Sequence, residues 1–302
     1  MKWFAKAMTF QILSRVPGGT RVHHALQELT GSTEQTDGRM EVKVRQTLRY
    51  WRWLENNTPP GWLPNASHLD LGTGWLPSVP VTMFALGAKR QYLVDVRRHL
   101  QPRAVTQTIT QLRAVAPRVG VKFPRMPKVP WDDLAVEAML EPLGMTYAAP
   151  YHELAQRIAG TVGYVTATYM LLHLDRSTLL SVLKTVHRLL APGGYFLGLT
   201  HLRQLFDGLD SRSSPFFALR YPDWFWETII NSRMMSYNRL KAPDYTQALQ
   251  EAGFKVVLME VEPGDPEDFA RLAQARVHAQ FSRYTLDDLA ARHLFIVARK
   301  PY

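Results

Sequence analysis

The chain has 302 residues, of which 46% are hydrophobic, and a formal net charge of +10. This size and apolar content suit one large domain, or a core with an extension. No apolar run approaches ~18 residues, which argues against a membrane span, and no cysteine is present, which excludes disulfides and thiolate chemistry. The first residues lack the pattern of a secretory signal, so we expect a cytoplasmic protein. We also expect no metal site.

Basic residues are scattered along the sequence, with one denser run in a predicted helix. That run is Arg39, Lys43, Arg45, Arg49 and Arg52. A positive surface can attract nucleic acid or anionic lipid, but no nucleic-acid-binding motif accompanies the run. We therefore expect a solvated helix face and a small-molecule substrate, with neither nucleic acid nor membrane as a partner. Whether the chain forms a homodimer stays open.

Residues 1–64 are predicted to be a helical extension that covers the site of the following domain. One amphipathic helix is expected over 2–15 and a second over 40–56, which proline- and glycine-containing turns follow. The second helix has apolar residues at helical spacing, namely Met40, Val44, Leu48 and Trp51.

Residues 65–302 alternate between apolar strands and amphipathic helices, the pattern of a mostly parallel sheet with helices on both faces. Strands are predicted near 67–71, 91–95, 120–124, 162–169, 194–200, 255–261 and 293–299. Helices are predicted near 78–87, 99–116, 176–190 and 243–252. The last strand is expected to be antiparallel.

The first predicted strand runs into the turn Asp70-Leu71-Gly72-Thr73-Gly74, and the second ends in Asp95. Glycines in such a turn let the backbone bend tightly and approach a ligand closely. A carboxylate at the carboxyl end of the second strand is placed to accept hydrogen bonds from ribose hydroxyls. Together the two features predict a site for a cofactor that contains a nucleoside.

A third phrase narrows this class, because Leu189-Leu190-Ala191-Pro192-Gly193-Gly194 precedes a later strand. The glycine turn, the acid and this phrase, in this order, resemble the class I S-adenosylmethionine (SAM) dependent methyltransferases. The resemblance spans roughly residues 66–300. It implies a Rossmann-like α/β fold with a seven-stranded, mostly parallel sheet, and SAM as the cofactor.

The resemblance also implies which residues hold SAM. Asp70, Gly72, Thr73 and Gly74 would lie under the methionyl part, with backbone amides meeting its carboxylate and Asp70 meeting its ammonium directly or through water, and Asp95 would bind the ribose. Trp75 is either a wall of the cofactor site or a plug in the core. The usual adenine-binding acid is missing from its phrase, so His152 or Glu153 takes that role, or Tyr151 stacks on the ring.

The reacting end of the site is expected at the fourth predicted strand. Tyr169 stands where related chains have a small polar residue, and Leu172 stands where they have Glu. The ring of Tyr169 either packs in the core or faces the sulfonium, since an aromatic face attracts a cation within ~6 Å. His173 is a candidate general base or a structural histidine.

Two later phrases resemble a subgroup of small-molecule methyltransferases in bacteria. Of the polar residues in the first motif of that subgroup, only His201 and Asp207 are present here, which argues against a metal or acid–base cluster at this point. The second phrase is nearly intact and includes Asn238, Arg239, Asp244 and Tyr245. This stretch is either an insertion that closes the pocket with aromatic side chains, or one in which Asn238 and Arg239 contact the methionyl end or the substrate.

The function implied by the resemblance is methyl transfer from SAM to a small molecule of secondary metabolism, with His173 or His201 as base. An alternative is intramolecular cyclisation of SAM to azetidine-2-carboxylic acid, with release of methylthioadenosine. Tyr169, Leu172 and the aromatic run over 216–226 suit the water-poor cage which that reaction needs. A third hypothesis is a non-catalytic SAM-fold protein that binds a partner through residues 1–64.

Overall fold

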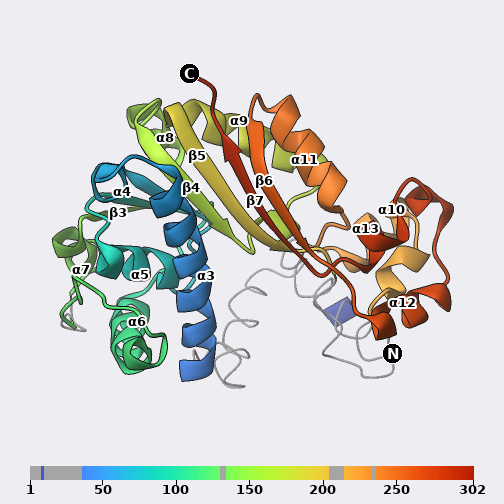
Figure 1. Ribbon diagram of the computed structural model, residues 1–302, viewed down its shortest axis with the longest axis horizontal. Helices are drawn as coiled ribbons and strands as arrows, with labels where there is room; N and C mark the ends of the chain where they lie inside the picture. The colour runs from blue at the N-terminus through green and yellow to red at the C-terminus, as the bar shows by residue number, and fades with distance from the viewer. Residues whose placement is uncertain (1–7, 10–35, 130–133, 204–213, 233–235) are drawn as a thin grey trace. The chain divides into compact units, whose positions relative to one another are not determined.

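The computed structural model describes residues 8–9, 36–129, 134–203, 214–232 and 236–302 (Figure 1). The predicted helix over 2–15 and the predicted role of Asp207 therefore lie outside the described residues, apart from Met8 and Thr9. The chain divides into two compact units. We call Gln35–Thr168, Thr185–Leu197 and Arg299–Tyr302 the N unit, and Tyr169–Lys184 with Gly198–Ala298 the C unit.

The strands form one seven-stranded sheet in the order β3-β2-β1-β4-β5-β7-β6. Their bounds are β1 His68–Leu71, β2 Gln91–Val94, β3 Met145–Ala148, β4 Val162–Thr168, β5 Leu190–His201, β6 Lys255–Glu262 and β7 His293–Arg299. β1 pairs in parallel with β2 and β4, and β2 pairs in parallel with β3. The predicted fold class, a mostly parallel Rossmann-like sheet with helices, is confirmed.

The last strand runs antiparallel to β5, as predicted. At the start of β5, Gly193 N donates to Lys300 O and Lys300 N donates to Gly194 O. At its end, Leu202 N donates to Arg292 O. The start of one strand therefore meets the end of the other, which is the pairing of antiparallel neighbours.

The helices of the N unit are α3 Asp37–Asn57, α4 Trp62–Asn65, α5 Ser78–Leu86, α6 Pro102–Val115, α7 Val136–Leu140 and α8 His152–Arg157. The helix predicted over 40–56 is α3, and Met40, Val44, Leu48 and Trp51 are all buried. Its first turn is capped by Thr36, whose hydroxyl accepts from Arg39 N at 3.4 Å. α3 packs against α5 and α6, and the three lie together in Figure 1.

Further α-helices in the described part of the chain are α9 Arg176–Leu189, which begins in the C unit, α10 Asp223–Phe225, α11 Ala242–Glu251, α12 Pro266–Ala273 and α13 Leu286–Ala290. A capping box starts α12, because Asp265 accepts from Asp268 N and Asp268 accepts from Asp265 N. The buried side chains of the C unit include two clusters, one around Phe216 and Phe281 and one around Trp226.

Two predicted elements need correction. The strand predicted near 120–124 is absent, and the missing edge strand is β3, where buried Met145 and Tyr147 alternate with exposed Thr146. The helix predicted over 99–116 begins at Pro102, because proline has no backbone N–H to leave unpaired in a first turn. Residues 99 and 100 instead donate their backbone amides to the Tyr147 hydroxyl.

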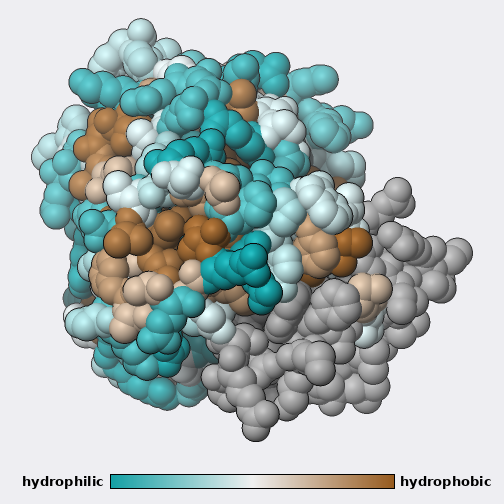
Figure 2. All heavy atoms as spheres, turned by 90° about the vertical axis from the view of Figure 1, so that its right-hand side faces the viewer, coloured by the Kyte–Doolittle hydropathy of each residue, from teal (hydrophilic) through white to brown (hydrophobic). Residues whose placement is uncertain are grey.

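The surface mixes polar and apolar side chains, as the face drawn in Figure 2 shows. On β6, an edge strand of the sheet, Val257, Met259 and Val261 are exposed. Among the described helices, none combines the length and the hydropathy that crossing a bilayer requires.

Candidate functional site

The glycine turn after β1 is tied to the end of β2. Gly72 and Gly74 have φ of 76° and 68°, the left-handed region that glycine tolerates. Gly72 N and Thr73 N both donate to Val94 O, at 2.9 and 3.2 Å, and Gly74 N donates to the Asp95 carboxylate at 3.0 Å. The expectation that these amides face the methionyl carboxylate is therefore corrected, because all three hold the turn against β2.

Asp95 keeps capacity for further hydrogen bonds. One carboxylate oxygen accepts from Gly74 N and the other from Val96 N at 2.7 Å and Arg97 N at 3.5 Å. An ionised carboxylate has about four lone-pair sites. At least one site is left for a hydroxyl group, and a ribose has two adjacent hydroxyls to offer.

Among the residues that the structure describes, space is open around Gly74. A Cβ added at Gly74 would meet nothing nearer than Gly72 O at 4.0 Å, so this glycine is not needed for tight packing. Trp75, the next residue, is 38% exposed, which argues against a plug in the core. Its indole lies 4.3 Å from the His99 ring. An open turn, a half-exposed aromatic pair and a carboxylate with spare acceptor sites fit a nucleoside-containing cofactor.

Asp70 is buried inside the sheet, in contrast to Asp95. Its carboxylate is 3.1 Å from the Thr166 hydroxyl, and only 4% of the residue is exposed. Burial raises the pKa of Asp70 to about 6, against the lowering effects of the Thr73 and Thr166 hydroxyls and of the Lys43 ammonium on α3. No feature of the sequence marked Lys43 or Thr166 as neighbours of the cofactor turn.

His152 is the first residue of α8, and its ring stacks on Tyr151 at 4.9 Å with 29° between the planes. Both side chains retain accessible surface, and Glu153 beside them is exposed. The three candidates for the adenine contact therefore stay candidates.

The C unit holds a second group of predicted residues. Tyr169 directly follows β4 with φ of 58°, the only positive φ of a non-glycine residue in the described ranges. An aromatic residue in this conformation is strained, and such strain persists where neighbouring contacts enforce it. Tyr169 N donates to Leu199 O at 2.7 Å, and the half-buried ring does not sit in the core.

An aromatic stack extends from Tyr169. Its ring lies 4.2 Å from His201 with 15° between the planes, and His201 lies 4.4 Å from His293. His293 Nδ1 is 2.7 Å from the Glu262 carboxylate. Sequence motifs mark Tyr169 and His201, but none marks His293 or Glu262.

The hydrogen-bond partner of His173 shows which of its ring nitrogens carries the proton. Nδ1 is 2.8 Å from Ser236 O, and since a carbonyl only accepts, Nδ1 carries the proton. The Nε2 of the neutral ring therefore presents a lone pair, as a general base requires. Desolvation by neighbouring protein atoms lowers the pKa of His173, against the raising effect of the Ser236 carbonyl.

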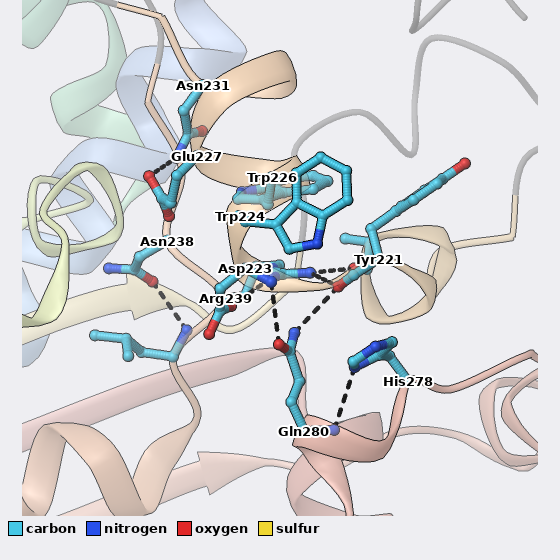
Figure 3. Close-up of polar contacts among 12 residues, drawn as sticks. Tyr221, Asp223, Trp224, Trp226, Glu227, Asn231, Asn238, Arg239, His278 and Gln280 are labelled. Atoms are coloured by element: carbon cyan, nitrogen blue, oxygen red, sulfur yellow. Dashed lines mark hydrogen bonds and ion pairs between the residues drawn. The ribbon is translucent and has the colours of Figure 1, made fainter.

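Asn238 and Arg239 make structural contacts (Figure 3). The Asn238 amide donates to Leu171 O and Leu174 O at 2.9 and 2.7 Å, and its oxygen accepts from Leu240 N and Tyr245 OH. Both amide hydrogens are used, so we no longer assign Asn238 a catalytic role; it positions the segment that carries His173.

The Arg239 guanidinium donates to Ala218 O, Tyr221 O and Asp223 and lies over the Trp226 and Phe281 rings. Its side chain is 4% exposed. These contacts support a structural role for Arg239.

The chain belongs to a methyltransferase family, because residues 63–259 match the model of the "Methyltransferase domain". The class predicted from the sequence, SAM-dependent methyltransferases of class I, and its cofactor SAM are thereby confirmed. No curated protein matches the chain.

Solved structures similar to the chain include three described as methyltransferases. One, described as a sarcosine dimethylglycine methyltransferase from Galdieria sulphuraria, is 14% identical over 84% of this chain and 86% of its own, with a TM-score of 0.42. A SAM-dependent methyltransferase from Mesorhizobium loti is 16% identical over 83% and 97%, with a TM-score of 0.39. The geranyl diphosphate C-methyltransferase from Streptomyces coelicolor A3(2) is 12% identical over 78% and 71%, with a TM-score of 0.39. The family assignment rests on the family model and not on these three.

Proposed function

We propose that the chain is an enzyme that transfers the methyl group of SAM to a small-molecule acceptor of secondary metabolism. The observation that carries the cofactor half of this proposal is the glycine turn held open against Asp95, which keeps acceptor capacity for the ribose hydroxyls. When bound, SAM supplies a methyl group made electrophilic by its sulfonium. The turn is formed by residues that include Asp70, Gly72, Thr73, Gly74 and Trp75. His152 stays the candidate for the contact with the adenine ring.

The proposed task of Tyr169 is to present its ring face to the cationic sulfur. Stacking on His201 at 4.2 Å holds the plane of the ring, and the strained backbone fixes its direction. A fixed aromatic face attracts a cation without the reorganisation that water requires.

The proposed base is His173, with His201 as the second candidate. His173 holds its proton on Nδ1 toward Ser236 O, so Nε2 accepts the proton of a hydroxyl or amine acceptor as the acceptor attacks. Its lowered pKa keeps this nitrogen unprotonated at neutral pH.

Two rings of the aromatic run are not available for the cage that the cyclisation alternative needs. Within the aromatic run over 216–226, Phe216 and Trp226 are 2% and 0% exposed and belong to core clusters of the C unit. Trp226 also donates its indole N–H to Tyr237 O at 2.7 Å. These two rings pack as core and are not free to build a cage around a folded methionyl chain.

The test is incubation of the full chain with SAM carrying an isotopically labelled methyl group, alone and with a library of small hydroxyl, amine and carbon acceptors. Mass spectrometry then follows the label. We expect label in an acceptor and S-adenosylhomocysteine as the co-product. Methylthioadenosine with a four-carbon cyclic amino acid from SAM alone would replace the proposal by cyclisation. Failure to bind SAM would favour the non-catalytic hypothesis.

A further inference from the structure

Four polar side chains form a continuous row inside the N unit, beneath the cofactor turn. Gln91 Oε1 is 2.8 Å from His68 Nδ1, His68 Nε2 is 2.8 Å from Thr166 Oγ1, and Thr166 Oγ1 is 3.1 Å from Asp70 Oδ1. The register places His68 beside Gln91 and Asp70 beside Thr166 on neighbouring strands. All four residues are between 0% and 4% exposed, so each contact must match a donor with an acceptor.

One end of the row is fixed by a backbone carbonyl. Gln91 Nε2 donates to Pro80 O at 2.9 Å, and a carbonyl can only accept. The oxygen of the Gln91 amide therefore faces His68, and His68 Nδ1 must carry a proton to donate to it.

Proton counting then constrains Asp70. If His68 is neutral, its Nε2 is a lone pair, and the single proton of the Thr166 hydroxyl points to it. The Thr166 oxygen then meets Asp70 Oδ1 with no proton of its own to offer, so the proton between them belongs to Asp70. If Asp70 is ionised instead, Thr166 donates to it, and His68 must carry protons on both nitrogens. Either way the row holds one proton more than a neutral His68 with an ionised Asp70 would hold.

The surroundings place this proton on Asp70. Burial lowers the pKa of His68 to about 4 and raises the pKa of Asp70 to about 6. The Thr73 and Thr166 hydroxyls oppose the rise where they donate to Asp70, as does Lys43 on α3, and the Asp95 carboxylate adds to it. When the Thr166 hydroxyl donates to His68 instead, its lowering effect on Asp70 is removed. The Tyr164 ring stacks on His68 at 4.8 Å and further excludes water from the row.

We propose that Thr166 and His68 are positioning residues that make Asp70 retain a proton well above the pH at which an ordinary aspartate ionises, and that a cationic group docking against Asp70 displaces this proton to solvent. Under the proposed function, on which this second step rests, the cation is the α-ammonium of SAM. The proton leaves the row because a doubly protonated His68 would put a third cation, beside Lys43 and the ammonium, into a buried site. The affinity for SAM then rises with pH until Asp70 is ionised in the free protein.

The first step is tested on the protein without SAM. Infrared spectra of the wild type should show a carboxylic-acid band that Asp70→Asn removes, and ¹⁵N NMR should show His68 protonated on Nδ1 alone. In His68→Leu the Thr166 hydroxyl is free to donate to Asp70. The midpoint, which is the pH at which half of the carboxylic-acid band is lost, should therefore fall by at least about one unit, a tenfold loss of proton affinity. Thr166→Ser keeps the hydroxyl and should leave the midpoint in place.

Two results would overturn the relay. One is an ionised Asp70 beside a neutral His68 at pH 5 to 6. The other is a midpoint in His68→Leu that stays or rises, as burial alone predicts for a less polar neighbour. Since the NMR reading uses the wild type, it decides the question even if His68→Leu does not fold.

The second step is tested by calorimetric titration of the full chain with SAM in two buffers of different protonation enthalpy. At a pH below the infrared midpoint, we expect release of about one proton per SAM by the wild type and none by Asp70→Asn. Binding of SAM by the wild type with no proton release would refute the displacement. Absence of SAM binding would instead count against the proposed function and leave the infrared and NMR result on the relay standing.

Discussion

Replacing Asp70 by Asn should make the stability of the chain depend on pH in a way that isolates one buried carboxyl. In the folded protein the pKa of Asp70 is raised from 3.8 to about 6 by burial. A raised carboxyl pKa means that stability is fully present below the unfolded value and is lost as pH rises through the folded value. The shift of about two units corresponds to about 3 kcal/mol at 1.36 kcal/mol per unit.

Asn is a close mimic of the protonated form, because its amide can donate to Thr166 as the acid would. His68 also titrates in this range, since burial lowers its pKa from 6.5 to about 4. Its contribution is present above the unfolded value and lost as pH falls, the opposite sense to Asp70. The difference between variant and wild type therefore cancels His68 to first order and reports Asp70.

The assay is urea unfolding of wild type and Asp70→Asn at intervals from about pH 4 to about pH 7.5. We expect the free energy of unfolding of the variant to gain about 3 kcal/mol on the wild type across this range. Glu267→Gln serves as the control. Glu267 forms an ion pair with Arg271 but is 71% exposed, so this variant should show no such change with pH. A difference between Asp70→Asn and wild type that does not change with pH would refute the reasoning.

Three further predictions concern the C unit. Tyr169→Phe should keep most of the kcat/KM because the ring face is retained, while Tyr169→Ala should lose at least about tenfold; equal losses would point to the hydroxyl. His173→Asn keeps a donor near the position of Nδ1 for Ser236 O but removes Nε2, so kcat should fall by about 10²-fold or more. The acid limb of the pH–rate profile, which we expect below the ordinary histidine pKa, should vanish. An unchanged profile would exclude His173 as base. Arg239→Met leaves the buried Ala218 carbonyl without its donor and should reduce the free energy of unfolding by about 2 kcal/mol, against about 0.5 kcal/mol for the exposed Arg271→Met, as measured by denaturant titration; equal effects would contradict the structural role of Arg239.

Sequence reasoning located the elements that have a strong local signal. The strands at β1, β2, β4 and β7 and the helix α3 follow from apolar runs and helical spacing. β3, Met145–Ala148, was missed because only two of its four residues are buried, whereas β1 and β2, which are equally short, are buried at four and at three positions. Its edge position, where it pairs only with β2, fits this partial burial.

The same limit applies to the site. The glycine turn and Asp95 are close in sequence to strand ends, so a local motif marks them. Lys43, His68 and Thr166 contribute through pairing between strands and packing of α3, which connect residues up to 98 positions apart for His68 and Thr166. Asn238 and Arg239 stood out in a recognisable phrase, yet a phrase does not tell whether a polar side chain faces a ligand or, as for these two residues, the backbone of its own chain.

The most direct test of the central claim is calorimetric titration of SAM into the wild type, Asp95→Ala and the control Glu267→Ala. Asp95 accepts from Gly74 N and offers its remaining acceptor capacity to the ribose. The variant therefore loses the charged hydrogen bonds to the ribose and also the hydrogen bond from Gly74 N that holds the turn. Hydrogen bonds to a charged group contribute about 1.5–3 kcal/mol, which is roughly 10- to 100-fold in Kd. We predict at least this loss for Asp95→Ala and unchanged affinity for the control. Wild-type affinity in Asp95→Ala would contradict the placement of SAM over the glycine turn.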